Sequence, residues 1–222
     1  MCQQITYKRQ TAFTLAEVLI TLLIIGVIAS IVIPGLIADT QNAEYKTAWK
    51  KTYAELDLAT RKILSDNAGN IKGTFTSSTA LKNEYKNYLN YIKDCDNGIS
   101  QGCWHASGVP KPFTGTATPY ADSYGASPAL ILSNGALVSI YLASPSCTYN
   151  QGILVCGWYF IDVNGFKGPN VQGKDILAVY LLEKSLRTMG ASNDPYPPST
   201  TCTSSSTGPG SGLGCSALYL TQ

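Results

Sequence analysis

Histidine is almost absent from this chain, and charged side chains are few. Its 222 residues include a single histidine, His105, and only 14% Asp, Glu, Lys and Arg. One histidine leaves little basis for Ser-His-Asp catalysis or for a histidine-rich metal centre. Sixteen basic residues against fourteen acidic ones create no strong positive field for nucleic acid. We therefore expect neither an enzyme nor a nucleic-acid-binding protein.

Two further motifs are missing. No pair of cysteines has the two-residue spacing of a zinc knuckle. The glycine-rich stretch 208–214 lacks the Lys-Ser/Thr of a phosphate-binding loop, and we expect it to form a flexible loop tip.

Apart from Cys2, the cysteines fall into three close pairs, which predict disulfides in an oxidising compartment. The predicted disulfides are Cys95–Cys103, Cys147–Cys156 and Cys202–Cys215.

One long apolar run lies near the N-terminus. Residues 18–38 carry no charge and would span roughly 30 Å as a helix, the thickness of a bilayer core. Lys8 and Arg9 precede the run and predict a cytoplasmic N-terminus. A secretory signal peptide has a shorter apolar core. A plain signal anchor shares this topology, but it leaves the acidic Glu17 at the edge of the run unexplained.

The residues around Glu17 form a more specific pattern. Ala12 precedes Phe13, Glu17 follows four positions after Phe13, and Pro34 lies further along the apolar run. This pattern resembles the leader and N-terminal helix of type IV pilins and type II secretion pseudopilins, with Ala12 where the family usually has Gly. The resemblance implies that a prepilin peptidase removes residues 1–12 and that the new N-terminus at Phe13 is methylated.

The resemblance also implies a function and partners. The chain would be a structural subunit without catalytic activity that assembles through its N-terminal helix, with Glu17 pairing to the Phe13 amine of a neighbour. Its partners would be homologous pilin or pseudopilin subunits, the prepilin peptidase, the assembly platform and the membrane. It would cross the cytoplasmic membrane once, with an extracytoplasmic head, and then enter a pilus at the cell surface or a periplasmic pseudopilus. The alternative is a minor tip subunit that binds a surface or cargo through the loop between Cys202 and Cys215.

The expected fold is α+β, with a long N-terminal helix packed on an antiparallel β-sheet head. Residues 13–38 would be the membrane or filament-core half of the helix, residues 39–65 its amphipathic half, and residues 66–222 the disulfide-stapled head. Apolar residues at helical spacing extend the helix to about residue 64. Pro34 and Gly35 are expected to bend or locally melt it, and residues 67–70 to end it.

Within the head, the pattern predicts a second helix over 78–92 and an irregular loop over 94–128. Two apolar runs flank Asn134-Gly135 and predict a hairpin with a type I′ turn. Further strands are expected over 153–163, 176–182 and 217–220. The fourteen tyrosines are expected mainly to pack and to cover strands, with carbohydrate or surface adhesion as the alternative.

One loop has the composition of a cation site. The segment 162–175 resembles a loop of some pilin-like proteins, near where certain pseudopilins bind calcium. Asp and Asn oxygens on a glycine-bent loop suit Ca²⁺. The same residues are ordinary turn formers, so a purely structural turn without metal is the competing hypothesis. Neither hypothesis requires a cofactor. If the loop binds calcium, the predicted ligands are Asp162, Asn164, Asn170 and Asp175.

Overall fold

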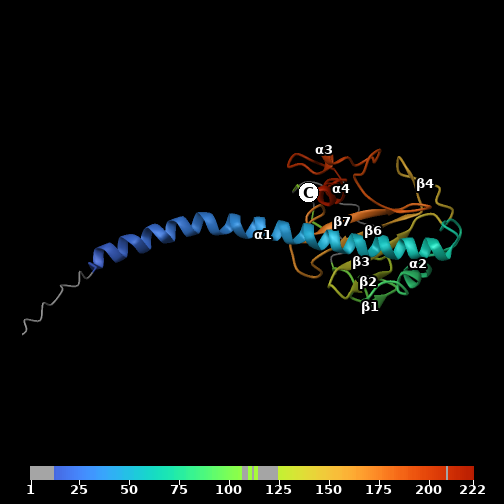
Figure 1. The fold of residues 1–222 in the computed structure, drawn as a ribbon, viewed down its shortest axis with the longest axis horizontal. Coiled ribbons are helices and arrows are strands. Elements are labelled where there is room, and N and C mark those ends of the chain that lie inside the picture. The colour runs from blue at the N-terminus through green and yellow to red at the C-terminus, as the bar shows by residue number, and fades with distance from the viewer. Residues whose placement is uncertain (1–12, 107–109, 112, 115–124, 209) are drawn as a thin grey trace, which may run out of the picture. The chain divides into compact units, whose positions relative to one another are not determined.

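The computed structural model describes residues 13–106, 110–111, 113–114, 125–208 and 210–222 (Figure 1). The predicted leader, residues 1–12 with Ala12, lies outside the described residues. The chain forms two compact units, one up to Ala43 and the other from Glu44 to Gln222. Helix α1 (Leu15–Asp66) contributes to both units.

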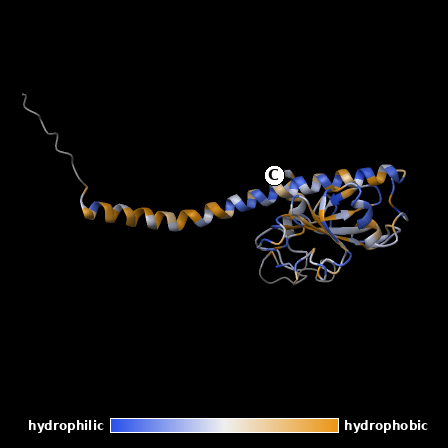
Figure 2. Ribbon diagram, turned by 90° about the horizontal axis from the view of Figure 1, so that it is seen from below, coloured by the Kyte–Doolittle hydropathy of each residue, from blue (hydrophilic) through white to orange (hydrophobic). Residues whose placement is uncertain are grey.

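In the first unit, α1 is long and apolar enough to cross a membrane (Figure 2). Its large apolar side chains between Val18 and Ile37 are exposed throughout. The helix runs without interruption through Pro34 and Gly35, so the expected local melting does not occur. Proline is tolerated in membrane helices when the freed carbonyl finds another partner or a small local adjustment.

The second unit, the head, is built on one antiparallel sheet in the order β1-β2-β3-β6-β7-β8 (Figure 1). A separate two-stranded hairpin interrupts this meander between β3 and β6. The sheet strands are β1 (Tyr91–Cys95), β2 (Ala129–Leu132), β3 (Leu137–Leu142), β6 (Gly157–Asp162), β7 (Ile176–Leu181) and β8 (Leu186–Thr188), and the hairpin strands are β4 (Tyr149–Asn150) and β5 (Leu154–Val155).

Both faces of the sheet are covered. From Glu44 onward α1 packs its apolar stripe, with Trp49, Leu56 and Ile63, against one face in the main core cluster. The opposite face carries a second cluster, in which Trp104 and Leu213 pack against the sheet. Burial on two sides explains why β7 reads as a continuous apolar run rather than as an alternating strand.

Three short helices complete the head: α2 (Ser78–Tyr85), α3 (Pro198–Thr201) and α4 (Cys215–Thr221).

The six cysteines of the head form the disulfides Cys95–Cys103, Cys147–Cys156 and Cys202–Cys215, which is the pairing predicted from the sequence. The α+β class is confirmed. Helix α1 ends at Asp66, followed by two residues with positive φ, Ala68 and Gly69, in agreement with the predicted stop.

Two predicted elements are wrong. The helix predicted over 78–92 ends at Tyr85, because the chain then turns and pairs as β1 with β2. The strand predicted over 217–220 is part of α4. A short apolar run fits a buried helix as well as a strand. Here the Ser216 hydroxyl accepts the backbone N–H of Ala178 (2.9 Å), on the edge of β7 beyond its pairing with β8.

The hairpin around Asn134-Gly135 is present, but its turn differs from the prediction. Gly135 donates its backbone N–H to Leu132, and only Gly135 has positive φ, at 88°. Asn134 therefore lacks the left-handed conformation that a type I′ turn needs at both central residues. Its side chain instead accepts from Ala136 (3.0 Å) and donates to Thr52 on α1 (3.2 Å).

Candidate assembly site

The N-terminal turn of α1 holds Glu17 in a reciprocal hydrogen-bond arrangement with Thr14. The backbone N–H and the hydroxyl of Thr14 each donate to Glu17 Oε2 at 2.8 Å. In return, the backbone N–H of Glu17 donates to Thr14 Oγ1 at 3.3 Å. This is a capping box, in which two otherwise unpaired N–H groups at the helix start are satisfied. The role of Thr14 was missed, although the spacing Thr14-x-x-Glu17 displays it.

The other polar side chains of this part of α1 are satisfied within the helix. The hydroxyls of Thr21 and Ser30 donate to the carbonyls of Val18 and Val27, at 2.9 Å and 2.8 Å. Thr40 donates to Leu36 at 2.8 Å. In a hydrocarbon environment an unpaired hydroxyl is costly, so these bonds suit the segment to lipid or to an apolar bundle. The rest of this helix surface is apolar and uncharged, and it has no packing partner among the described residues of its own unit.

Pro34 lies inside this apolar helix. Because proline has no N–H, the carbonyl four residues earlier, that of Ser30, loses its usual intrahelical donor. The structure thus places Phe13, Glu17 and Pro34 along one continuous segment, as expected from the sequence.

In the head, the loop 162–175 gathers the predicted calcium ligands, but both carboxylates already accept hydrogen bonds. Asp175 accepts the backbone N–H groups of Asn170 and Val171, each at 2.7 Å. Asp162 accepts from the backbone of Asn164 at 3.1 Å. These bonds are the pattern of a structural turn. No group of three His, Cys, Asp or Glu suited to a metal occurs among the described residues, and calcium binding stays a prediction.

His105 contacts the same loop. Its Nε2 lies 2.8 Å from Oδ2 of the fully buried Asp162, and its ring meets Phe166 edge-on at 5.5 Å. Burial raises the pKa of Asp162 to about 6, although the hydrogen bond with His105 opposes that shift. The pair ties the segment after Cys103 to the end of β6, a structural role for the lone histidine.

The loop closed by Cys202–Cys215 is packed rather than free. Ser211 and Leu213 are buried, and the Gln172 amide donates to the carbonyl of Ser211 at 2.6 Å. Gly212 lies against Gly173 so closely that an added Cβ would come within 2.3 Å of the Gln172 carbonyl oxygen. The prediction of a flexible tip over 208–214 is therefore wrong for Ser211–Gly214, because glycine-to-glycine contact anchors this stretch to the head.

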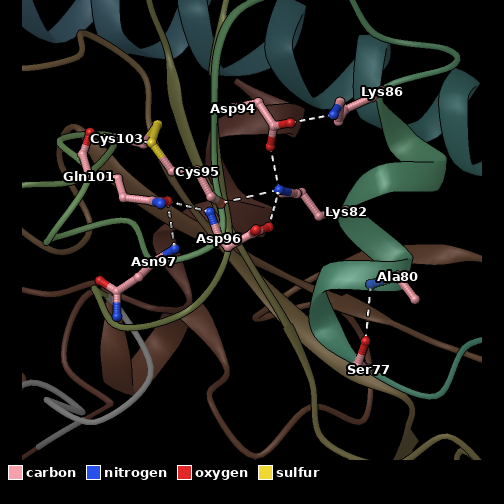
Figure 3. A network of polar contacts seen from close by, with 10 residues as sticks. All are labelled: Ser77, Ala80, Lys82, Lys86, Asp94, Cys95, Asp96, Asn97, Gln101 and Cys103. Carbon is pink, nitrogen blue, oxygen red and sulfur yellow. Dashed lines mark hydrogen bonds and ion pairs between the residues drawn. A yellow bond between two sulfur atoms is a disulfide. The ribbon is translucent and has the colours of Figure 1, made fainter.

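A buried lysine organises the region around the first disulfide, and no sequence pattern indicated it (Figure 3). The Lys82 side chain is 2% exposed and makes ion pairs with Asp94 and with Asp96, the latter at 2.7 Å. Lys86 binds the second oxygen of Asp94. Burial favours the neutral form of Asp94, but the hydrogen bonds from both lysines outweigh it and hold its pKa below the ordinary 3.8. The network fixes β1 to α2.

Together, a helix long and apolar enough to cross a membrane and an antiparallel sheet give the chain a pilin-like α+β arrangement. A family model described as the prokaryotic N-terminal methylation motif matches residues 7–33. That motif is the signature of type IV pilins and pseudopilins, and it includes Phe13 and Glu17. No curated protein and no solved structure matches the chain significantly.

Proposed function

We propose that this chain is a structural subunit of a type IV pilus or a type II secretion pseudopilus. The observation that carries the proposal is the methylation motif over residues 7–33, with Glu17 four positions after Phe13 at the start of an exposed apolar helix. Such a subunit is a substrate of prepilin peptidase and assembles with other pilin-like subunits. Its function depends on packing between subunits, and no catalytic step is assigned to it.

Glu17 sets the register of assembly in this proposal. Cleavage before Phe13 creates an α-amine, a cation at the end of an apolar helix. When helices bundle, a carboxylate without a cation in apolar surroundings is strongly disfavoured, and so is an amine without an anion. When Glu17 of one subunit pairs with the Phe13 amine of its neighbour, both charges are satisfied at one axial offset between the two helices. Any other offset leaves both charges unpaired and is disfavoured.

The capping box supports this role, because it gives the carboxylate local donors before a neighbour arrives. Thr14 supplies two hydrogen bonds, but neither donor carries a positive charge. No basic side chain among the described residues forms an ion pair with Glu17, and in the proposal the Phe13 amine of a second subunit supplies the cation that Thr14 does not.

The test separates charge from capping. Full-length chains with Glu17→Gln and Glu17→Ala are expressed with the assembly machinery, and Glu44→Gln serves as a control on an exposed acid of the same helix. Glutamine can still accept from Thr14, so it keeps the cap and removes the charge. Both Glu17 variants are expected to be cleaved and N-methylated at Phe13, by mass spectrometry, yet to be missing from sedimented filaments. Normal incorporation of Glu17→Gln would refute the pairing.

The tip-binding alternative receives less support from the head. It places the partner on the loop between Cys202 and Cys215, whose second half is buried against the sheet. Among the described residues of that loop, the exposed ones are Ser204, Ser205 and Thr207. A shaft subunit is therefore the function we favour.

A further inference from the structure

A row of aromatic side chains crosses the sheet on the face opposite α1. Tyr141 on β3 and Trp158 on β6 are direct cross-strand partners, with ring centroids 4.8 Å apart. Trp158 is in turn the partner of Tyr180 on β7. Tyr149, from the β4–β5 hairpin, brings its ring to 5.5 Å from Trp158 on another side. We call Tyr141, Trp158 and Tyr149 the aromatic patch.

These three rings are not fully buried, although Trp158 packs against the second core cluster. Tyr141 and Trp158 are partly exposed and Tyr149 is exposed, whereas the paired Tyr85 and Tyr159 on the other face are completely buried. The two buried tyrosines bond each other through their hydroxyls at 3.2 Å. Trp158 also differs from the other tryptophans, Trp49 and Trp104, which are 0% and 2% exposed. A partly exposed tryptophan beside two tyrosines presents amphipathic surface to solvent.

The hairpin that carries Tyr149 is held in place. The Cys147–Cys156 disulfide closes it at its base, and its tip lies beside Pro195, since a Cβ added at Gly152 would be 3.4 Å from Pro195 Cδ. The aromatic patch is therefore presented by a sheet and a cross-linked hairpin, which lowers the entropy cost of ordering it around a ligand.

The sequence segment that carries the patch is polar but uncharged. No charged residue occurs between Asp122 and Asp162, a segment that includes β3, the hairpin and most of β6. Directly before Tyr149, the hydroxyls of Ser144, Ser146 and Thr148 form a mutually bonded triangle, with separations of 3.0–3.2 Å. At the end of the aromatic row, the charged Arg187 on β8 is the cross-strand partner of the buried Tyr180.

We propose that the aromatic patch binds a neutral saccharide. A pyranose ring has one apolar C–H face and a rim of hydroxyls, and the patch offers the complement: aromatic faces bordered by uncharged hydroxyls and amides. The C–H face stacks on Trp158, while Tyr141 and Tyr149 flank it. Nucleic acids and acidic polysaccharides fit less well, because their phosphates, sulfates or carboxylates need basic partners that this segment lacks.

The test uses the purified full-length chain in a zwitterionic detergent without a sugar headgroup, and it does not depend on filament assembly. The probes are cellohexaose, maltohexaose and chitohexaose, with oligo(dT) and a heparin oligosaccharide as charged comparisons. Because only Trp158 among the three tryptophans is appreciably exposed, acrylamide quenching of fluorescence reports its contact with a sugar. Affinities are measured in parallel by calorimetry, which also serves for Trp158→Phe.

The matched variants are Tyr149→Ser and Tyr91→Ser, since these tyrosines are 43% and 41% exposed on different parts of the head. At least one neutral hexasaccharide is expected to protect Trp158 from the quencher. Tyr149→Ser and Trp158→Phe should each weaken binding about tenfold, whereas Tyr91→Ser should bind like the unchanged chain. Equal unfolding midpoints for the two serine variants establish that folding is intact.

Three results would overturn the proposal. The first is that none of the neutral hexasaccharides protects Trp158 up to its solubility limit. The second is that Tyr149→Ser and Tyr91→Ser bind equally well, which would place the sugar elsewhere. The third is binding of oligo(dT) or the heparin oligosaccharide alone, which would assign the patch to a charged polymer.

Discussion

Helix α1 passes through two environments, and its two parts treat apolar side chains in opposite ways. In the N-terminal unit the apolar side chains are exposed on every side, and Leu23 is 68% exposed. In the head the same helix has an apolar stripe on one side only, and Leu56 is completely buried against the sheet. The first part needs lipid or other subunits to cover it, while the second finds its partner within the chain. One helix therefore joins an exposed apolar segment to the folded head.

The largest expected effect uses the same substitution on each side of this comparison. Leu56→Ala leaves a cavity in the main core and should lower the free energy of unfolding of the head by about 2–5 kcal/mol. Leu23→Ala removes no contact within the head and should leave that free energy unchanged. Urea unfolding of the full-length chain in micelles, followed by tryptophan fluorescence, measures both. A comparable loss in Leu23→Ala would contradict the independence of the two units.

The second effect concerns the covalent links, which occur only in the head. Replacing Cys202 and Cys215 together with serine should cost about 3 kcal/mol of head stability, because the unfolded chain regains the freedom of a closed loop. The N-terminal helix should still insert and be processed. Unfolding midpoints and N-terminal mass spectrometry check the two statements, and loss of processing in the double variant would contradict the second.

A third prediction tests the buried Lys82. Lys82→Met keeps the apolar stem but removes the cation between Asp94 and Asp96, and it should cost about 1–3 kcal/mol. Lys86→Met, a control at a more exposed partner of the same Asp94, should cost less than about 1 kcal/mol. Equal costs, measured by urea unfolding at neutral pH, would contradict the central role of Lys82.

The ion pair between Lys82 and Asp94 also makes the stability of the head depend on pH. The pKa of Asp94 is lowered in the folded head, so its contribution to stability is present above the ordinary carboxyl pKa of 3.8 and is lost as the pH falls through the lowered value. Lys82→Met should flatten this acid-side loss. Unfolding free energies measured between neutral pH and the acid limit of folding give the comparison.

The smallest effect is expected from calcium. Because Asp162 and Asp175 already accept hydrogen bonds from the loop itself, millimolar CaCl₂ should leave the melting temperature of the head the same as in EDTA. A concentration-dependent rise in melting temperature would instead establish the calcium site predicted from the sequence, since a ligand that binds the folded state stabilises it. Asp175→Asn would then remove that rise.

Much of the assembly helix was predictable because its signals are local. Charge, apolar length and the Phe13-to-Glu17 spacing require no knowledge of distant contacts, and even the missed Thr14 cap is visible as a four-residue motif. The hairpin around Asn134-Gly135 was predictable for the same reason. Its turn type was not, because the Asn134 amide reaches across to Thr52 on α1.

In the head, contacts between distant residues overruled several local patterns. The apolar residues after Ala217 fit a strand or a helix, and they are helical in α4, where Ser216 accepts hydrogen bonds from Ala178 and from Trp49. Gly212 looked like part of a flexible loop until Gly173 was placed against it.

The sequence alone determined the membrane-length helix, the capped acidic residue at its start and the pairing of neighbouring cysteines, because short-range spacing carries each of these. Only the tertiary structure decided that a lysine is buried between two aspartates and that the C-terminal disulfide loop is packed. It also decided that a tryptophan and two tyrosines from separate strands share one neutral surface. Each of these features depends on contacts between separate elements of the head, which no local spacing displays.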